Sequence, residues 1–153
     1  MPYSSNPYYR FDAYLASGWF NEDQRHTRDN ILRITHGLGM SVFNPEAESL
    51  VDADSTLNLQ AQVFNGNLNA INDSKMVIVN TAGKDMGTIF EAGYSFCLAK
   101  AIVYYCEGLK GNFNLMLAQS GNCVATSPEE LEGHLRGLKI DPNYRRSYVG
   151  NIE

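Results

Sequence analysis

Motifs of many nucleotide- and metal-dependent enzymes are missing from this chain of 153 residues. No Gly-x-Gly-x-x-Gly follows the first predicted strand and no Gly-x-x-x-x-Gly-Lys-Ser/Thr occurs, so the phosphate cradles of dinucleotide and nucleoside triphosphate sites are absent. There is no Gly-x-Ser-x-Gly nucleophile elbow. His26 and His36 have no metal-like spacing, and the remaining histidine, His134, is predicted on a polar terminal helix. A serine or cysteine triad therefore lacks its base and a metal site lacks its ligands, so we expect neither a cofactor nor a metal.

Cysteine is scarce. Cys97, Cys106 and Cys123 lie far apart and form no Cys-x-x-Cys pair, so a structural zinc site is not expected. The odd number, together with an N-terminus that has no basic and no apolar leader region, favours a reducing cytoplasm as the location. Cys97 and Cys106 stand in apolar surroundings and are predicted to be buried packing residues.

Basic clusters and long apolar runs are absent too. The formal net charge is −5, and no Lys/Arg cluster offers a surface for nucleic acid or for an anionic membrane. No apolar run approaches the length of a membrane span. We therefore expect no nucleic-acid partner and no membrane partner.

The chain is long enough for one domain. With 153 residues, of which 44% are apolar, it can bury roughly 70% of its unfolded surface in a single core. Residues 1–9, which include Pro2 and Pro7, are predicted to form an N-terminal extension. Residues 139–153 are predicted to form a C-terminal tail that packs on another surface.

Apolar runs and helical periodicities alternate along the chain. Strands are predicted at residues 11–16, 40–43, 76–79, 101–105 and 123–125. Helices are predicted after Asn21, at 56–71, around Glu91, at 112–117, and from Ser127 to a stop at Gly137. This alternation predicts an α/β fold with a mainly parallel sheet of about five strands and helices on both faces.

Ligands in such folds bind beyond the carboxyl ends of the strands. Three segments should converge there: residues 17–20, residues 81–88 and the segment after Tyr105. A small residue such as Gly18 lets a ligand come close to the backbone. Trp19 and Phe20 next to it form either an aromatic wall of the site or part of the core.

Two carboxylates stand in the segment from Lys84 to Leu98. Asp85 is predicted in a loop and Glu91 in the first turns of the following helix. Paired carboxylates can act as nucleophile and proton donor at a glycosidic carbon. The alternative is that Glu91 is a solvated acid favoured by the helix dipole. The neighbours predicted to be buried favour the functional interpretation; they are Phe90, Ala92 and Gly93.

Four segments, in this order, resemble the nucleoside 2-deoxyribosyltransferase family. They are Tyr14–Gln24 (YLASGWFNEDQ), Phe64–Ile71 (FNGNLNAI), Asp85–Tyr94 (DMGTIFEAGY) and Asn114–Met116 (NLM). The resemblance implies a Rossmann-like, flavodoxin-type three-layer sandwich and one transferase-like domain over residues 1–153. It also implies a homo-oligomer, either a hexamer or another dimer-based assembly.

The resemblance implies an exchange of the base of 2′-deoxynucleosides, with deoxynucleosides and free nucleobases as ligands. Glu91 matches a nucleophile that forms a covalent deoxyribosyl ester in a ping-pong reaction. Tyr14 matches the residue that orients this nucleophile, and Asp85 matches a carboxylate that holds the sugar hydroxyl or the base. The matching segments also imply substrate contacts for Trp19, Phe20, Gly18, Gly87, Asn67, Asn114 and Met116.

Two of these substrate contacts are implied to come from a neighbouring subunit. Asn114 and Met116 match residues that complete a neighbour's site, with Asn114 reaching the 5′-hydroxyl. The segment from Ser147 to Glu153 matches the family's tail only loosely.

Asn67 departs from the family pattern. Many relatives carry Asn-Asp-Leu where this chain has Asn67 before Leu68, and that aspartate is implied to protonate the leaving base. An amide can hydrogen-bond a base but cannot deliver a proton at neutral pH. Either Asp85 does this work, or water-mediated protonation suffices, or the base preference has changed. The choice between purines and pyrimidines stays open.

Two other functions are compatible with the same residues. A related N-glycosidase would hydrolyse deoxynucleosides or their 5′-monophosphates with Glu91 and water. It should carry phosphate-binding groups near the first loop, where Arg25 and Arg28 stand beside offsetting acids. A non-catalytic nucleotide-binding module is the third possibility, and the joint presence of Tyr14, Asp85 and Glu91 argues against it.

Overall fold

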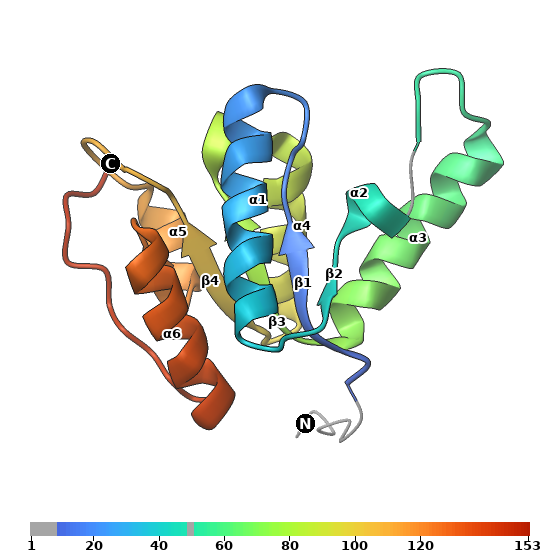
Figure 1. Cartoon of the computed structure of the whole chain (residues 1–153). Helices are drawn as coiled ribbons and strands as arrows, with labels where there is room; N and C mark the ends of the chain where they lie inside the picture. Colours follow the sequence, from blue (N-terminus) through green and yellow to red (C-terminus); the bar gives the residue numbers. More distant parts are fainter. Residues whose placement is uncertain (1–8, 49–50) are drawn as a thin grey trace.

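The computed structural model describes residues 9–48 and 51–153, so the predicted N-terminal extension lies outside it except for Tyr9. Five parallel strands form one sheet in the order β2-β1-β3-β4-β5 (Figure 1). The strands are β1 (Phe11–Ala16), β2 (Val42–Phe43), β3 (Ser74–Asn80), β4 (Ala101–Tyr105) and β5 (Cys123–Ala125). The helices are α1 (Glu22–Gly37), α2 (Pro45–Glu48), α3 (Leu57–Asn72), the 3₁₀ turn η1 (Ala82–Lys84), α4 (Met86–Cys97), α5 (Leu115–Ser120) and α6 (Pro128–Ile140). The predicted fold class is confirmed, because this strand order is that of the flavodoxin-type sheet.

The sheet separates two hydrophobic cores. Because side chains alternate along a strand, Leu15 faces one side and Tyr14 the other. Helices α1 and α6 cover the Leu15 side, where Ile31 and Leu135 are fully buried. Helices α3, α4 and α5 contribute to the Tyr14 side. Three layers result, as expected for a parallel sheet whose faces are both covered.

Helix α3 is attached to the core by its C-terminal end alone. Only Ala70 and Ile71 of this helix are buried, while Leu57 at its start is 82% exposed. In Figure 1 the helix leans away from the sheet. One copy of the chain therefore leaves much of the apolar surface of α3 uncovered.

The ends of several elements differ from the sequence-based prediction. Strand β2 covers only Val42–Phe43, because Met40 still donates its N–H to Thr35 at the end of α1. Helix α5 starts at Leu115 rather than at residue 112, because Asn114 caps it by accepting from the N–H of Leu117 at 3.2 Å.

Helix α6 does not stop at Gly137 but continues to Ile140, so the tail begins at Asp141 and not at residue 139. The ring of Tyr144 occupies the space that a Cβ at Gly137 would need. The glycine there permits close packing of the tail and does not end the helix.

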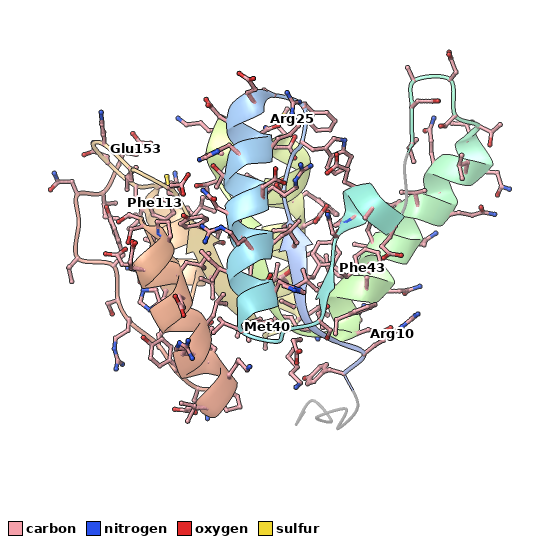
Figure 2. The ribbon with its side chains drawn as sticks, in the orientation of Figure 1. Arg10, Arg25, Met40, Phe43, Phe113 and Glu153 are labelled. Atoms are coloured by element: carbon pink, nitrogen blue, oxygen red, sulfur yellow. The ribbon has the colours of Figure 1, made fainter. Side chains whose placement is uncertain are left out.

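The tail folds back on the chain itself. Phe113 and Ile152 form a parallel bridge, and the N–H of Phe113 donates to the carbonyl of Asn151 at 2.9 Å. The rings of Phe113 and Tyr148 lie 5.5 Å apart. Figure 2 shows Phe113 and Glu153 on the same side of the molecule. Residues 151–153 thus lie alongside residues 113–115, which lead into α5.

Two further sequence-based expectations can be compared with the structure. Cys97 is exposed and Cys106 is half-buried, so the prediction that both are buried was wrong for Cys97, which lies at the solvent side of the end of α4. Within residues 9–48 and 51–153, no helix has both the length and the apolar character needed to span a membrane.

Candidate active site

Tyr14 is held rigidly in the sheet. It lies on β1, is 0% exposed, and its ring stacks on Phe43 of β2 with centroids 5.5 Å apart and planes at 12°. The register pairs Tyr14 with Phe43 directly across the two strands. Since neighbouring cross-strand side chains restrict one another, the phenol has little freedom to move.

Glu91 lies in the second turn of α4, on the same side of the sheet as Tyr14. The helix begins at Asp85, whose Oδ2 accepts hydrogen bonds from the N–H of Thr88 at 2.8 Å and from its hydroxyl at 2.9 Å. Asp85 is therefore the N-cap of α4 as well as a candidate site residue. Asp85 caps the helix through Oδ2. In this position its carboxylate is close enough to Glu91 for the two charges to interact.

Tyr14 and Glu91 are an exception to the rule that buried polar atoms are hydrogen-bonded. In the part of the chain that the structure describes, the only buried side-chain polar atoms without a hydrogen-bond partner are Oη of Tyr14 and Oε2 of Glu91. The two groups face each other closely enough to influence each other's ionisation. The hydroxyl of Tyr14 and the carboxylate of Glu91 thus interact with each other at this edge of the sheet, and no third group of the described residues bonds these two atoms.

The environment makes Glu91 hard to ionise. Burial raises its pKa to about 7, the charge of Asp85 acts in the same direction, and interaction with the Tyr14 hydroxyl opposes both. Burial likewise raises the pKa of Tyr14, and the Glu91 charge adds to this effect. Tyr14 therefore stays neutral and Glu91 exchanges its proton near neutral pH, which suits a group that takes part in chemistry.

Trp19 and Phe20 follow β1 at the carboxyl edge of the sheet. Their ring centroids are 5.0 Å apart, and Phe20 is 68% exposed. Phe20 is therefore not a core residue, and the pair forms an aromatic surface open to a ligand. The space beside Gly18 is filled by the side chain of Gln24, so a ligand does not approach the backbone from that side.

Helices α3 and α4 meet through two aromatic rings. Phe64 and Phe90 lie 5.9 Å apart, and each is about half exposed, at 50% and 52%. Asn67 follows Phe64 by three residues, so it belongs to the side of α3 that faces α4. Of the three neighbours of Glu91 predicted to be buried, only Ala92 is. Phe90 and Gly93 are exposed.

Asn114 and Met116 are not part of the Tyr14–Glu91 cluster. They line a cavity of about 580 Å³ between the segments that follow β3 and β4. Lys84, Ile89 and Glu153 also line this cavity, and neither Tyr14 nor Glu91 does. A single copy thus brings together Tyr14, Asp85 and Glu91, with Gly87 in the first turn of the same helix. Asn114 and Met116 line the adjoining cavity, to which Lys84 and Ile89 of the same segment contribute.

The structure adds residues that the sequence did not single out. Phe43 fixes Tyr14, and Gln24 and Asn80 form a buried polar link beneath the loops of the site. The segment Tyr14–Gln24 already contains one of them, although its spacing cannot reveal which way an amide points. Within the described ranges, no group of three or more His, Cys, Asp or Glu side chains could hold a metal ion.

A flavodoxin-type sheet with a buried carboxylate and phenol at its carboxyl edge defines a class of α/β domain with a ligand site at the ends of β1 and β3. Comparison with protein families gives the particular family. The model of the family "Nucleoside 2-deoxyribosyltransferase" matches residues 13–129, and the chain belongs to this family. It is thus an enzyme acting on nucleosides, either a transferase or a glycosidase.

Solved structures resemble the whole domain. The 2-deoxyribosyltransferase of Bacillus psychrosaccharolyticus superposes with a TM-score of 0.76 at 24% identity, over 90% of this chain and 98% of that chain. A conserved protein from Enterococcus faecalis V583 gives 0.64 at 15% identity, over 81% and 96%. The CMP N-glycosidase BcmB of Clostridium botulinum gives 0.52 at 15% identity, over 81% and 97%. No curated protein sequence matches the chain. These likenesses show the shared fold.

Proposed function

We propose that this chain is a nucleoside 2-deoxyribosyltransferase that exchanges the base of 2′-deoxynucleosides. In the first half-reaction the Glu91 carboxylate attacks C1′, the bond from C1′ to the base nitrogen breaks, and the base leaves with the bonding electrons and takes up a proton. In the second half-reaction the nitrogen of another base attacks C1′, loses its proton and releases Glu91. The observation that carries the proposal is the buried pair of Tyr14 Oη and Glu91 Oε2, which influence each other's pKa and have no other hydrogen-bond partner in the part of the chain that the structure describes.

Tyr14 orients and activates the nucleophile in this reaction. Its hydroxyl lowers the pKa of Glu91 against the effect of burial, which favours the ionised form that attacks C1′. Phe43 prevents the phenol from turning away. Trp19 and Phe20 offer the base a stacking surface, since every base has an aromatic face.

Asp85 is the carboxylate available to protonate the leaving base or to hold the sugar. It is half-buried and already placed beside Glu91 by its role as N-cap of α4. Asn67 cannot supply a proton but can hydrogen-bond the base. Gly87 keeps the first turn of α4 small, since a Cβ there would come within 3.3 Å of Asp85 Oδ2.

A homo-oligomer would complete the site. Helices α3, α4 and α5 expose large apolar side chains, among them Phe64, Met86, Phe90 and Met116. Monomeric proteins rarely expose apolar side chains over an extended patch. Asn114 and Met116 line a cavity to which neither Tyr14 nor Glu91 contributes, and this supports their action in a neighbour's site.

A base-exchange assay tests the proposal. The protein is incubated with deoxyinosine, with and without free adenine, and the products are separated by chromatography. New deoxyadenosine, formed at a rate that depends on adenine, is the expected result. Hypoxanthine release that ignores adenine would identify a hydrolase instead. Thymidine as the donor then decides between purine and pyrimidine preference.

Hydrolysis of the glycosidic bond is the second candidate function. The observation that favours it is the shared fold with the CMP N-glycosidase BcmB, together with an amide at Asn67 in place of an acid. A 5′-monophosphate substrate would need free cations near the first loop. The charge of Arg28 is offset by Glu46 and Asp29. Arg25 donates one of its five N–H groups to the carbonyl of Trp19. The pairing of Arg28 favours nucleosides over nucleotides as substrates.

A further inference from the structure

Gln24 is buried beneath the aromatic loop of the site. It lies in the first turn of α1 and is 3% exposed. Its side-chain oxygen accepts a hydrogen bond from the N–H of Phe20 at 2.8 Å. The next residue, Arg25, donates to the carbonyl of Trp19 at 3.1 Å. The start of α1 therefore holds the backbone of both aromatic residues.

Gln24 also touches the loop that leads to Asp85. A Cβ on Gly18 would lie 2.7 Å from Nε2 of Gln24, and a Cβ on Gly83 would lie 2.5 Å from the same atom. Gly83 has a φ of 70°, a conformation that glycine adopts easily, and the absence of a side chain leaves room for the Gln24 amide. Since Gly83 precedes Asp85 by two residues, one side chain is packed between the two loops of the site.

A second buried amide joins the same two loops. Asn80, at the end of β3, donates to the hydroxyl of Ser17 at 2.9 Å and to the carbonyl of Gln24 at 3.1 Å. Its side-chain oxygen accepts from the N–H of Ala82 at 3.0 Å. Asn80 anchors the loops to the sheet, and Gln24 fills the space between them.

We propose that Gln24 is a positioning residue, which sets the place of Trp19 and Phe20 relative to Asp85 and Glu91. It touches neither the nucleophile nor its phenol partner, so it acts through the backbone of the two loops. Because the aromatic pair is the surface offered to the base, loss of Gln24 weakens base binding more than it slows the bond-breaking step. The expected effect on base binding rests on the proposed function.

The test begins with Gln24→Met, which keeps the volume of the side chain and removes the oxygen that accepts from Phe20. We expect the KM for the acceptor base to rise roughly 10- to 100-fold with kcat changed less than about threefold. Thr35→Val is the matched control. Thr35 is equally buried on α1, and its hydroxyl bonds only to carbonyls within its own helix, at Ile31 and Leu32. This control should leave both constants unchanged per folded protein.

Gly18→Ala provides an independent test. The new methyl group would displace the end of the Gln24 side chain, which is flexible, so the protein should fold while the bond to Phe20 is lost. Gly18→Ala alone should therefore raise the KM as Gln24→Ala does. Adding Gly18→Ala to Gln24→Ala should then change the KM less than twofold, because the atom that it displaces is already gone. Full additivity would contradict the proposal and would mean that Gly18 acts on a ligand directly.

Trp19 gives a readout that does not need turnover, because it is the only tryptophan of the chain. In Gln24→Met we expect its emission maximum to shift and its quenching by acrylamide to increase, with both unchanged in Thr35→Val. Unchanged Trp19 emission in a folded Gln24→Met protein would overturn the proposal. If the wild-type protein exchanges no bases, the proposed function fails, and Trp19 emission still decides whether Gln24 positions the loop.

Discussion

Phe43 stacks on Tyr14 with the two rings almost parallel, and this contact holds the phenol against Glu91 of α4. An amide in place of Glu91 keeps the shape of the side chain and removes its charge. Glu91→Gln should abolish base exchange, with a loss on the order of a thousandfold or more, because the amide cannot form the ester. Glu91→Ala should behave in the same way with its fold intact by circular dichroism. Full activity in either variant would sink the assignment of the nucleophile.

Glu91→Gln should stabilise the folded protein at high pH. The folded-state pKa of Glu91 is raised from 4.5 to about 7, so the folded protein holds this proton more tightly than the unfolded chain. The resulting stability is fully present below about pH 4.5 and is lost as the pH rises through 7. Glutamine does not ionise, so the Glu91→Gln protein keeps this stability above pH 7.

Urea unfolding at matched protein concentration should therefore give Glu91→Gln a free energy of unfolding about 1–3 kcal/mol above the wild type at pH 8. At pH 4.5 the difference should nearly vanish. Equal stability of the two proteins at pH 8 would show that Glu91 is not strained by burial.

Tyr14→Phe and Asp85→Asn should move the pH profile in opposite directions. The Tyr14 hydroxyl lowers the pKa of Glu91, and the Asp85 charge raises it. The rise of kcat/KM with pH should therefore move to higher pH in Tyr14→Phe and to lower pH in Asp85→Asn. On the acid side, a change of one in this pKa alters the ionised fraction of Glu91 about tenfold. Asparagine still caps α4, so the second variant keeps the helix start. Movement of both profiles in the same direction would refute this arrangement of the three groups.

The sheet could be predicted from the sequence because its strands are marked by local patterns. The runs at 11–16, 101–105 and 123–125 coincide with β1, β4 and β5, and the parallel order follows from the helices between them. The helix starts at Asn21 and Ser127 could also be predicted, because an N-cap depends only on the residues of its own turn.

Features that depend on distant residues could not be predicted. A glycine such as Gly137 is typical of a helix end, but here Tyr144 packs on it and α6 continues to Ile140. Asp85 and Glu91 stood out as paired carboxylates and Tyr14 through the family resemblance, whereas Phe43 and Gln24 act through contacts that no spacing encodes. The exposure of Cys97 depends on which side of α4 faces solvent, and this is fixed only by packing.

Two glycines of α6 should respond in opposite ways to alanine. Nothing lies within 4 Å of a Cβ placed on Gly133, so Gly133→Ala should stabilise the protein by up to about 1 kcal/mol through helix propensity. Gly137→Ala would collide with the ring of Tyr144 and should destabilise the protein by about 1–3 kcal/mol as the tail is displaced. Thermal unfolding of the two variants beside the wild type measures both effects. Equal stabilisation by both would mean that Tyr144 does not pack on α6.

Sharing of sites between subunits can be tested by mixing two inactive variants. Glu91→Gln lacks the nucleophile, and Asn114→Asp lacks the amide donor while keeping an oxygen to cap α5. If Asn114 serves a neighbour's Glu91, a mixed dimer has one intact site, built from the Glu91 of one subunit and the Asn114 of the other. Random mixing should restore roughly a quarter of the wild-type activity, because half of the dimers are mixed and each regains one of two sites. The two proteins are mixed, dissociated, reassociated and assayed for exchange. Activity equal to the average of the separate variants would place Asn114 in its own subunit's site or outside the site.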